Sequence, residues 1–512
     1  MEIIPKLVFL VVLDGFGLSD KAEGNAIKIA KPEFLGKLFS ERPFTKLAAS
    51  GLGVGLPKGQ MGNSEVGHLN IGAGRIVYQD IARINKSIED GSFFNNQVLI
   101  REICNSRDAG KAIHITGLLS DGGVHSHTSH LFALLELLKK LDAKNVFLHV
   151  FTDGRDTSTT SGVHFMRRLC EKLKSLNIGK IASISGRYFG MDRDQRWERI
   201  EKSYLAMVHG VGNRSTDPIL AMEASYKTNV TDEFIVPLVI EHEGKPIGVI
   251  DNGDTLISIN FRSDRMRQIL KSFTDSTFSS FGTKDLALKV ISFTKYSHEF
   301  NFPVVFPSVN LEKVLGELLS ENKVPQFRCT ETEKYAHITY FMNGGREESF
   351  PFEERLLIPS PKVKTYDLKP EMSAFEIGDA LMEKLNSKKF PVVMTNLANC
   401  DMIGHTGNLK AAVEAVHVVD CVLSKIIPVA YDHGYDCIIT SDHGNVEKML
   451  DEMTGEPFTE HTLNPVPFCL LTRENYTLAG SGNLADIAPT ILELLKINKP
   501  EIMDGKSLLR KK

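Results

Sequence analysis

The sequence contains no CxxC pair, no long apolar run and no marked excess of charge of either sign. Its seven cysteines are scattered and odd in number, which fits reduced thiols in a cytoplasmic protein better than a disulfide framework. With 60 basic and 64 acidic residues, the formal net charge is −4. This balance does not favour non-specific binding to nucleic acid or to a membrane surface.

The most apolar stretch near the N-terminus, residues 7–13 (LVFLVVL), is far too short to span a bilayer. It also lacks the small-residue cleavage site of a signal peptide, because Asp14 and Gly15 follow at once. We therefore predict a buried first strand with Asp14 at its carboxyl end, and no transmembrane segment.

Strand-like runs alternate with helical patterns along the chain, and no repeat period or low-complexity tract is present. This alternation predicts an α/β fold, with helices layered on mainly parallel sheets and functional sites at the carboxyl ends of strands. The strand-like runs fall at 7–13, 112–118, 145–150, 180–185, 391–395 and 436–440, and helical patterns at 130–141, 195–209, 409–427 and 484–495.

A length of 512 residues with a hydrophobic fraction of 42% predicts more than one domain. If Asp14 and Ser64 share a site with residues 401–461, the block that follows Ser64, about 77 to 310, is an insertion. We therefore predict a discontinuous metal-binding domain, 1–76 with 311–512, and an inserted substrate-binding domain, 77–310. Two chain crossings of this type tend to act as hinges.

Residues 61–68 (MGNSEVGH) place a serine at the start of a predicted helix. Asn63 or Ser64 can act as its N-cap. A helix N-terminus also favours an anion, so the hydroxyl of Ser64 is well placed to meet a phosphate. On local pattern alone a capping serine is the commoner case, and the choice depends on aspartates and histidines far away in the sequence.

Those aspartates and histidines flank three strand-like runs near the C-terminus. Together with Asp14 they make six protein ligands, and Ser64 makes a seventh, which suits two metal ions about 4 Å apart better than one tetrahedral ion. Carboxylates and imidazoles without thiolates favour Mn²⁺ or Zn²⁺. The residues are Asp401 and His405 after one run, Asp442 and His443 after the next, and His461 before a third.

A metal ion beside Ser64 would lower the pKa of its hydroxyl and stabilise charge on a transferring group without a Ser-His-Asp triad. Phosphoryl transfer is the chemistry that most needs this help. The glycines at 51–55 are only a weak nucleotide-loop match, because no Walker lysine follows in register.

Arginines follow strand-like runs of the predicted insertion. Guanidinium groups bind carboxylate and phosphate oxygens in pairs, so several converging arginines indicate a small polyanionic substrate. Surface ion pairing is the alternative for any one of them, since each has an aspartate nearby. The residues are Arg155 with Asp156, then Arg187 and Arg193, then Arg262 and Arg265.

The segment 121–130 has a His-x-His spacing that could hold zinc. The alternative that we favour is a helix that begins between His127 and His130, with Ser126 or Thr128 as its cap. This arrangement leaves His125 free in the preceding loop.

Taken together and in order, these motifs resemble those of the cofactor-independent phosphoglycerate mutases, a family of the alkaline phosphatase superfamily. The resemblance covers essentially the whole chain. It rests on LDGFG at 13–17, MGNSEVGHLNIGAGR at 61–75, TDGRDT at 152–157, SGRYFGMDR at 185–193, FRSDR at 261–265, DMIGHTG at 401–407, SDHGN at 441–445 and HTLNPVPF at 461–468.

The resemblance implies an alkaline-phosphatase-like three-layer domain with an inserted α/β domain, a monomer in the cytoplasm, and phosphoglycerate as a small-molecule substrate. It implies two divalent ions, Mn²⁺ first, with Co²⁺, Mg²⁺ and Zn²⁺ as alternatives, and no 2,3-bisphosphoglycerate. One ion would be held by Asp14, Ser64, Asp442 and His443, and the other by Asp401, His405 and His461.

For catalysis, the resemblance implies that Ser64 takes the phosphoryl group of 3-phosphoglycerate as phosphoserine and returns it to the 2-hydroxyl. Asp156 would shuttle the proton between the hydroxyls. Arg262, Arg265 and Lys334 would steady the phosphoryl group, and His125, Arg155, Asp156, Arg187 and Arg193 would hold the glycerate.

Two departures from the family pattern stand out. Thr157-Ser158-Thr159 and Cys400 occupy places where members of the family often have prolines, and neither departure removes a ligand. The rival functions are a metal-dependent phosphomonoesterase, another mutase on the same core such as a phosphopentomutase, and a metal-stabilised binding protein without catalysis.

Overall fold

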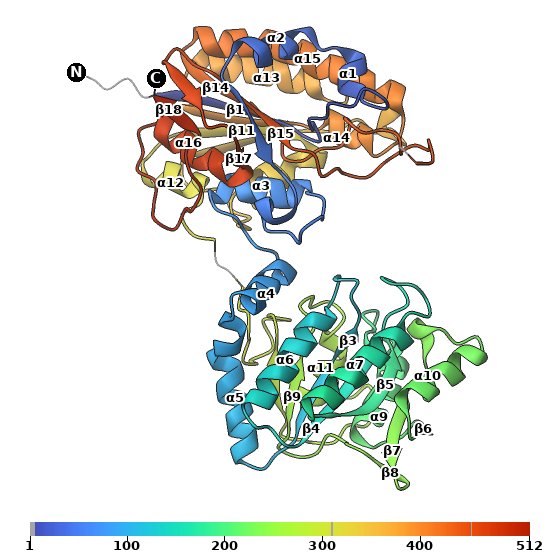
Figure 1. The fold of residues 1–512 in the computed structure, drawn as a ribbon. Helices are drawn as coiled ribbons and strands as arrows, with labels where there is room; N and C mark the ends of the chain where they lie inside the picture. The colour runs from blue at the N-terminus through green and yellow to red at the C-terminus, as the bar shows by residue number, and fades with distance from the viewer. Residues whose placement is uncertain (1–5, 309–310, 452, 512) are drawn as a thin grey trace. The chain divides into compact units, whose positions relative to one another are not determined.

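The structure is a computed structural model that describes residues 6–308, 311–451 and 453–511. The chain forms two compact units, unit 1 (residues 1–79 and 310–512) and unit 2 (residues 80–309), shown in Figure 1. The sequence placed these boundaries at 77 and 310. Among the described residues, no helix combines the length and the apolar character that a membrane span requires.

Unit 1 is built on an eight-stranded sheet whose central strands are parallel. β1 pairs in parallel with β13 and β14, and β11 pairs in parallel with β12 and β13, whereas β15 runs antiparallel to β14 and β2. In sheet order the strands are β12 (Glu353–Ile358), β11 (Gln326–Glu331), β13 (Val392–Leu397), β1 (Leu7–Leu13), β14 (Tyr435–Thr440), β15 (Val466–Leu471), β2 (Phe44–Ala48) and β17 (Gly482–Asn483).

Helices cover both faces of this sheet, which makes unit 1 a three-layer structure (Figure 1). One face packs against α1 (Ala26–Ala30), α2 (Glu33–Glu41), α13 (Ala374–Ser387), α14 (Asn399–Gly404) and α15 (Leu409–Asp432). The other packs against α3 (Ser64–Ala73), α12 (Leu315–Glu321) and α16 (Ile487–Leu494). The α/β class predicted from the alternation of patterns is confirmed.

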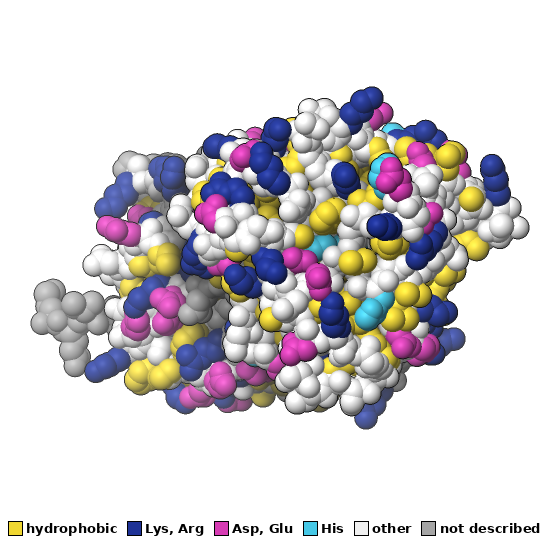
Figure 2. All heavy atoms as spheres, turned by 90° about the horizontal axis from the view of Figure 1, so that it is seen from below, with side chains coloured by type: hydrophobic (Ala, Val, Ile, Leu, Met, Phe, Trp, Pro, Cys, Tyr) yellow, Lys and Arg dark blue, Asp and Glu magenta, His cyan; other side chains and the backbone are white. Residues whose placement is uncertain are grey.

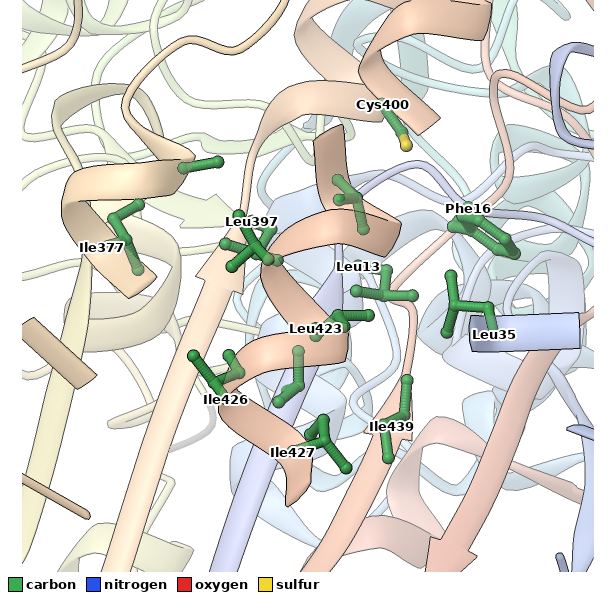
Figure 3. Packing of buried hydrophobic residues seen from close by; sticks show 14 of the residues in the cluster. Leu13, Phe16, Leu35, Ile377, Leu397, Cys400, Leu423, Ile426, Ile427 and Ile439 are labelled. Atoms are coloured by element: carbon green, nitrogen blue, oxygen red, sulfur yellow. The ribbon is translucent and has the colours of Figure 1, made fainter. Parts of the chain in front are cut away.

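The apolar run of β1 supplies both cores because successive side chains of a strand point to opposite faces. Phe9, Val11 and Leu13 enter the core under α15, and the alternate valine and leucine positions enter the core under α3. Figure 3 shows Leu423 and Ile427 of α15 close to the strand residues of the first core. Burying each such side chain contributes about 1.5–3 kcal/mol.

Unit 2 has its own sheet, with β9, β3, β4 and β5 running parallel at its centre. In sheet order the strands are β10 (Lys289–Ser292), β9 (Thr255–Ser258), β3 (Ile113–Leu119), β4 (Val146–Thr152), β5 (Lys180–Gly186), β7 (Leu238–His242) and β6 (Asn213–Ser215), with β8 (Lys245–Pro246) paired to β7. Its helices are α4 (Asp80–Glu89), α5 (Gln97–Asp108), α6 (Thr128–Lys140), α7 (Gly162–Leu176), α8 (Arg187–Gly190), α9 (Trp197–Val208), α10 (Pro218–Lys227) and α11 (Arg267–Thr274).

Short elements complete the two units. They are the 3₁₀ turns η1 (Gly51–Val54), η2 (Ser92–Asn95), η3 (Asp232–Phe234), η4 (Thr332–Lys334), η6 (Tyr366–Leu368) and η7 (Leu484–Asp486), the π-helical turn η5 (His337–Phe341), and the strand pair β16 (Tyr476–Leu478) and β18 (Leu509–Lys511). On the face in Figure 2, basic and acidic side chains are interspersed and neither sign forms a continuous patch.

Local details differ from the sequence predictions at three helices. The cap of α6 is His127, whose ring accepts the N–H of Ser129, and not Ser126 or Thr128. The predicted helix at 409–427 continues to Asp432 with Pro428 inside it, because burial of its long apolar face outweighs the proline penalty. The predicted helix at 484–495 begins as the 3₁₀ turn η7 before α16.

Candidate metal centre and arginine cluster

The parallel strands of unit 1 deliver acidic residues to one edge of the sheet. Asp14 follows β1, Asp401 lies in the short helix after β13, and Asp442 follows β14. β15 runs antiparallel to β14, so the amino end of β15 lies at this same edge. His461 comes just before that end and therefore also lies there. The chain therefore gathers side chains from positions 14 to 461 because of the strand order alone.

Ser64 opens α3 and is nearly buried, with 6% of its surface exposed. Asn63 is the N-cap and accepts the N–H of Val66, which leaves the hydroxyl of Ser64 for other partners. Its Oγ lies 3.1 Å from Asp14 Oδ1 and 3.0 Å from His443 Nε2. Ser64 is therefore more than a helix cap, because its hydroxyl faces the acidic edge.

Lys334, in the turn after β11, supplies the positive charge of this site. Its Nζ donates to Ser64 Oγ at 2.8 Å, to Asp14 Oδ1 at 2.7 Å and to Asp401 Oδ2 at 2.6 Å. Burial alone would lower the pKa of this lysine, but the charges of Asp14 and Asp401 outweigh burial and raise it. The ammonium in turn holds the pKa of Asp14 well below its ordinary value, against the effect of burial.

Asp401 is the meeting point of two histidines. His405 Nε2 lies 3.2 Å and His461 Nε2 lies 3.1 Å from its Oδ1. The other ring nitrogen of each histidine makes a hydrogen bond to the backbone. Nδ1 of His405 donates to the carbonyl of Thr459, and Nδ1 of His461 donates to the carbonyl of Gly62. Both rings thus present Nε2 to the same place, as metal-binding histidines do.

Asp442 and His443 are both fully buried. Asp442 Oδ1 accepts backbone N–H groups, whereas its Oδ2 has no hydrogen-bond partner. His443 Nε2 lies 3.6 Å from that oxygen. Burial opposes protonation of His443, but Asp442 and Asp401 raise its pKa to about 10.

These residues fit divalent cations. Three sets of ligand atoms have members within 4.8 Å of one another: Asp401 with His405 and His461, Asp14 with Asp401 and His443, and Asp14 with His68 and Asp442. A buried carboxylate oxygen without a partner is costly unless a cation or a donor meets it. Carboxylate and imidazole donors suit Mn²⁺ and Zn²⁺.

Cys400 precedes Asp401 but does not extend the ligand set. Its side chain is buried and packs in the core under α15. Burial, with smaller contributions from nearby carboxylates, raises the pKa of the thiol. The group therefore remains a neutral core residue, and the departure from proline at this position leaves the ligands intact.

His68 and Asn396 belong to the site although the sequence predicted neither. His68 lies one helical turn after Ser64, and its Nδ1 donates to the Ser64 carbonyl at 2.9 Å. The amide of Asn396 lies 2.6 Å from Asp14 Oδ2 and 3.0 Å from His68 Nε2. The same Nδ1 lies 3.3 Å from Asp442 Oδ2, so His68 contacts the backbone of Ser64 and the side chain of Asp442 and belongs to one of the three candidate sets. The four-residue spacing from Ser64 was the only sequence signal.

Two glycines allow α3 to approach this edge closely. A Cβ at Gly67 would lie 2.7 Å from the carbonyl oxygen of Asp442, and one at Gly62 would lie 2.0 Å from that of Ala49. The helix can place Ser64 beside Asp14 only because these positions carry no side chain.

In unit 2, a second group of predicted residues lies at the carboxyl ends of the parallel strands. Arg187 Nη1 donates at 2.6 Å to both Asp153 and Asp156. His125 Nε2 lies 3.9 Å from Asp156. Burial, followed by the charge of Arg187, lowers the pKa of His125 to about 4, so its ring is neutral at physiological pH.

Asp264 joins the remaining residues of the arginine cluster and was not predicted as a site residue. It accepts from Arg193 at 2.8 Å, and its other oxygen lies 3.2 Å from Arg262. Arg265 donates to a backbone carbonyl, and its pKa is lowered by burial and then by the charges of three neighbouring arginines. Arg155 is half exposed and pairs with Glu233 at 3.6 Å.

The structure thus gathers the predicted residues into two sets. Unit 1 brings together Asp14, Ser64, Lys334, Asp401, His405, Asp442, His443 and His461. Unit 2 brings together His125, Asp156, Arg187, Arg193, Arg262 and Arg265, with Arg155 at the margin.

Comparisons with known proteins agree on one family. Residues 84–298 match the family described as the BPG-independent PGAM N-terminus. The chain is 49% identical over 511 residues to the 2,3-bisphosphoglycerate-independent phosphoglycerate mutase of Lachnoclostridium phytofermentans, covering 99% of each chain. It is 50% identical over 507 residues to the protein of the same name from Clostridium acetobutylicum, covering 98% of this chain and 99% of that one.

Among solved structures, the chain is similar to a Leishmania mexicana phosphoglycerate mutase crystallised at low cobalt concentration. The TM-score is 0.60 and the sequence identity is 31%, with 100% of this chain and 99% of that chain covered.

Proposed function

Because the chain belongs to the 2,3-bisphosphoglycerate-independent phosphoglycerate mutases, it interconverts 3-phosphoglycerate and 2-phosphoglycerate, and we propose that it does so through a phosphoryl group carried on Ser64. The observation that carries this proposal is the set of contacts at Ser64 Oγ. Asp14, His443 and Lys334 all lie within 3.1 Å of that one oxygen.

The proposed metal ligands all lie in unit 1. Asp14, Ser64, Asp442 and His443 would hold one divalent ion, and Asp401, His405 and His461 would hold the other. We assign Mn²⁺ to both from the family resemblance; carboxylate and imidazole donors without thiolates fit this ion, as they also fit Zn²⁺. When bound, these ions lower the pKa of the serine hydroxyl and neutralise charge on the transferring phosphoryl group.

Ser64 reacts as its alkoxide, which the Lys334 ammonium neutralises, so the serine itself neither loses nor gains a proton during the two steps. In the first step, Ser64 Oγ forms a bond to phosphorus and the bond from phosphorus to the 3-oxygen of the glycerate breaks. In the second step, the 2-oxygen forms a bond to phosphorus, the bond from phosphorus to Ser64 Oγ breaks, and the alkoxide is regenerated. Lys334 already donates to Ser64 Oγ, so its ammonium is placed to meet the oxygens of a phosphoryl group there.

The residues of unit 2 retain the glycerate between the two steps. Arg187, Arg193 and Arg155 bind its carboxylate and His125 donates to it as a neutral ring, while Arg262 and Arg265 meet phosphoryl oxygens. Asp156 gives a proton to the leaving 3-oxygen and takes one from the 2-hydroxyl, which balances the two steps. Its carboxylate is held in place by Arg187 at 2.6 Å.

Phosphorus NMR tests this proposal. Protein supplied with Mn²⁺ and 3-phosphoglycerate, without 2,3-bisphosphoglycerate, should produce the 2-isomer, and chelation of the metal should stop turnover. Ser64→Ala should reduce turnover by about 10⁴-fold or more while the fold persists, because a nucleophile cannot be replaced by its neighbours.

The rival functions give different spectra. Release of inorganic phosphate without the 2-isomer would identify a phosphomonoesterase. Turnover that requires the bisphosphate, or that continues without metal, would contradict the proposed mechanism. An Asn63→Ala variant is the matched control, since it removes the helix cap beside Ser64 and should cost about 1 kcal/mol of stability without abolishing turnover.

We further propose that the protein acts as a monomer in the cytoplasm. All seven cysteines are free, and four of them are buried, as expected of a chain that folds under reducing conditions. Light scattering coupled to size-exclusion chromatography should give the mass of one 56.9 kDa chain, and a mass of twice that value would contradict it.

A further inference from the structure

Glu447 is a buried carboxylate next to the metal centre that the proposed mechanism does not use. It follows His443 by four residues, and 2% of its surface is exposed. One oxygen accepts the backbone N–H groups of Gly17 at 3.0 Å and Asn445 at 2.8 Å. The other accepts the amide of Asn464 at 3.0 Å and the hydroxyl of Thr462. All four donors are uncharged.

These four donors come from three segments, of which the one with Gly17 lies 430 residues before Glu447. Gly17 lies in the loop that carries Asp14, and Asn445 in the loop that carries Asp442 and His443. Thr462 and Asn464 lie in the loop that carries His461. A single carboxylate thus connects the loop of Asp14, the loop of Asp442 and His443, and the loop of His461.

The surrounding backbone leaves space for this carboxylate. A Cβ at Gly17 or at Gly444 would overlap the side chain of Glu447. The N–H of Thr462 also donates to the carbonyl of Gly444. The loop of Asp442 and His443 is therefore in direct contact with the loop of His461.

Glu447 also adds negative charge to the centre. Its charge, with those of Asp14 and Asp401, contributes to raising the pKa of the buried Cys400 thiol. Four acidic groups, Asp14, Asp401, Asp442 and Glu447, share the buried edge with one lysine and with His443, whose pKa they help to raise. This excess favours divalent cations.

We propose that Glu447 is a positioning residue that ties the three ligand-bearing loops together and thereby sets the affinity of the centre for divalent metal. The proposal rests on the metal centre described under Proposed function. A carboxylate is required because all four neighbours donate, whereas an amide would turn an N–H group toward at least one donor. Outer-shell partners of this kind typically change metal affinity by about 10–100-fold.

The test is calorimetric titration of metal-free protein with Mn²⁺, which does not depend on catalysis. Glu447→Gln should bind Mn²⁺ about 10–100-fold more weakly than the unaltered chain. Asp486→Asn is the matched control, because Asp486 also ties two segments, accepting the N–H groups of Asn483 and Lys506 away from the metal ligands. That control should lower thermal stability but leave Mn²⁺ affinity within about twofold, since it touches no ligand-bearing loop.

A second readout separates positioning from catalysis. At saturating Mn²⁺, Glu447→Gln should recover a kcat within about threefold of the unaltered chain with an unchanged KM for phosphoglycerate, since every ligand and reacting group remains. Thr462→Val removes one donor only and should weaken Mn²⁺ binding less than Glu447→Gln, which provides a test if the latter does not fold.

Equal Mn²⁺ affinity in Glu447→Gln and the unaltered chain would overturn the proposal, as would unchanged affinity in Thr462→Val where Glu447→Gln does not fold. If the unaltered chain itself bound no Mn²⁺, the proposed metal centre would fail as well, so the two failures are distinguishable.

Discussion

At the scale of single residues, Lys334 is, among the residues that the structure describes, the only basic side chain other than histidine in contact with Asp14 and Asp401. Lys334→Met therefore removes the ammonium that two buried carboxylates share and leaves only histidines as their cationic neighbours, which should cost about 3–5 kcal/mol in the free energy of unfolding of metal-free protein. Mn²⁺ should restore more stability to this variant than to the unaltered chain, because it replaces the missing charge. Denaturant unfolding with and without Mn²⁺ measures both quantities.

Lys389→Met is the control for this measurement. Lys389 forms an exposed pair with Glu354, and surface pairs of this kind contribute little. Equal losses of stability in the two variants would show that the Lys334 ammonium has no special role as a buried counter-ion.

Asp156 is the residue on which the proton transfers of the proposed mechanism depend. Asp156→Asn keeps an oxygen for the 2.6 Å contact with Arg187 but cannot accept a proton. We expect kcat to fall by about 10²–10⁴-fold with a much smaller change in KM. Steady-state kinetics by phosphorus NMR checks this, and an unchanged kcat would assign the shuttle to another group.

At the scale of elements, the approach of α3 to the strand ends decides whether Ser64 reaches its partners. Gly67→Ala places a methyl group 2.7 Å from the carbonyl oxygen of Asp442. The helix must shift, which should cost about 1–3 kcal/mol of stability and weaken Mn²⁺ binding. Thermal unfolding and calorimetric titration measure the two effects.

Gly36→Ala is the matched control for this substitution, because Gly36 lies in α2 with no atom within 4 Å of an added Cβ. Alanine there should raise stability by up to about 1 kcal/mol through its higher helix propensity. A similar gain at Gly67 would mean that the close approach of α3 places no constraint on the site.

At the scale of the whole molecule, buried histidines make unit 2 sensitive to acid. Burial lowers the pKa of His130 to about 3, and burial with the charge of His114 lowers that of His149 well below its ordinary value. Each ring is neutral in the folded state but titrates near 6.5 when unfolded, so the unfolded state binds more protons below that pH. Stability is therefore fully present above pH 6.5 and is lost as the pH falls toward 4.

The expected loss is about 2 kcal/mol for each histidine between pH 6.5 and pH 5. The single tryptophan, Trp197, lies at the start of α9, so its fluorescence reports the unfolding of unit 2. His130→Gln should flatten the dependence of stability on pH, whereas the exposed control His242→Gln should leave it unchanged. If the unaltered chain, His130→Gln and His242→Gln all lost stability equally as the pH falls, this account would be contradicted.

The sequence by itself determined the α/β class and the residue types at the strand ends. In a parallel sheet all carboxyl ends lie at one edge, so acidic residues placed after the neighbouring strands β1, β13 and β14 are brought to the same edge. The order of the motifs likewise determined the family, which the similarity to the clostridial enzymes over nearly the whole chain then showed.

Only the tertiary structure decided which side chains support those ligands. The contact of Lys334 with Asp14 joins positions 320 residues apart, and the contact of Asn396 with Asp14 spans 382. Glu447 likewise gathers donors from three loops. No local pattern encodes such contacts, because they arise where separately folded segments pack against one another and each buried charge must find its partners.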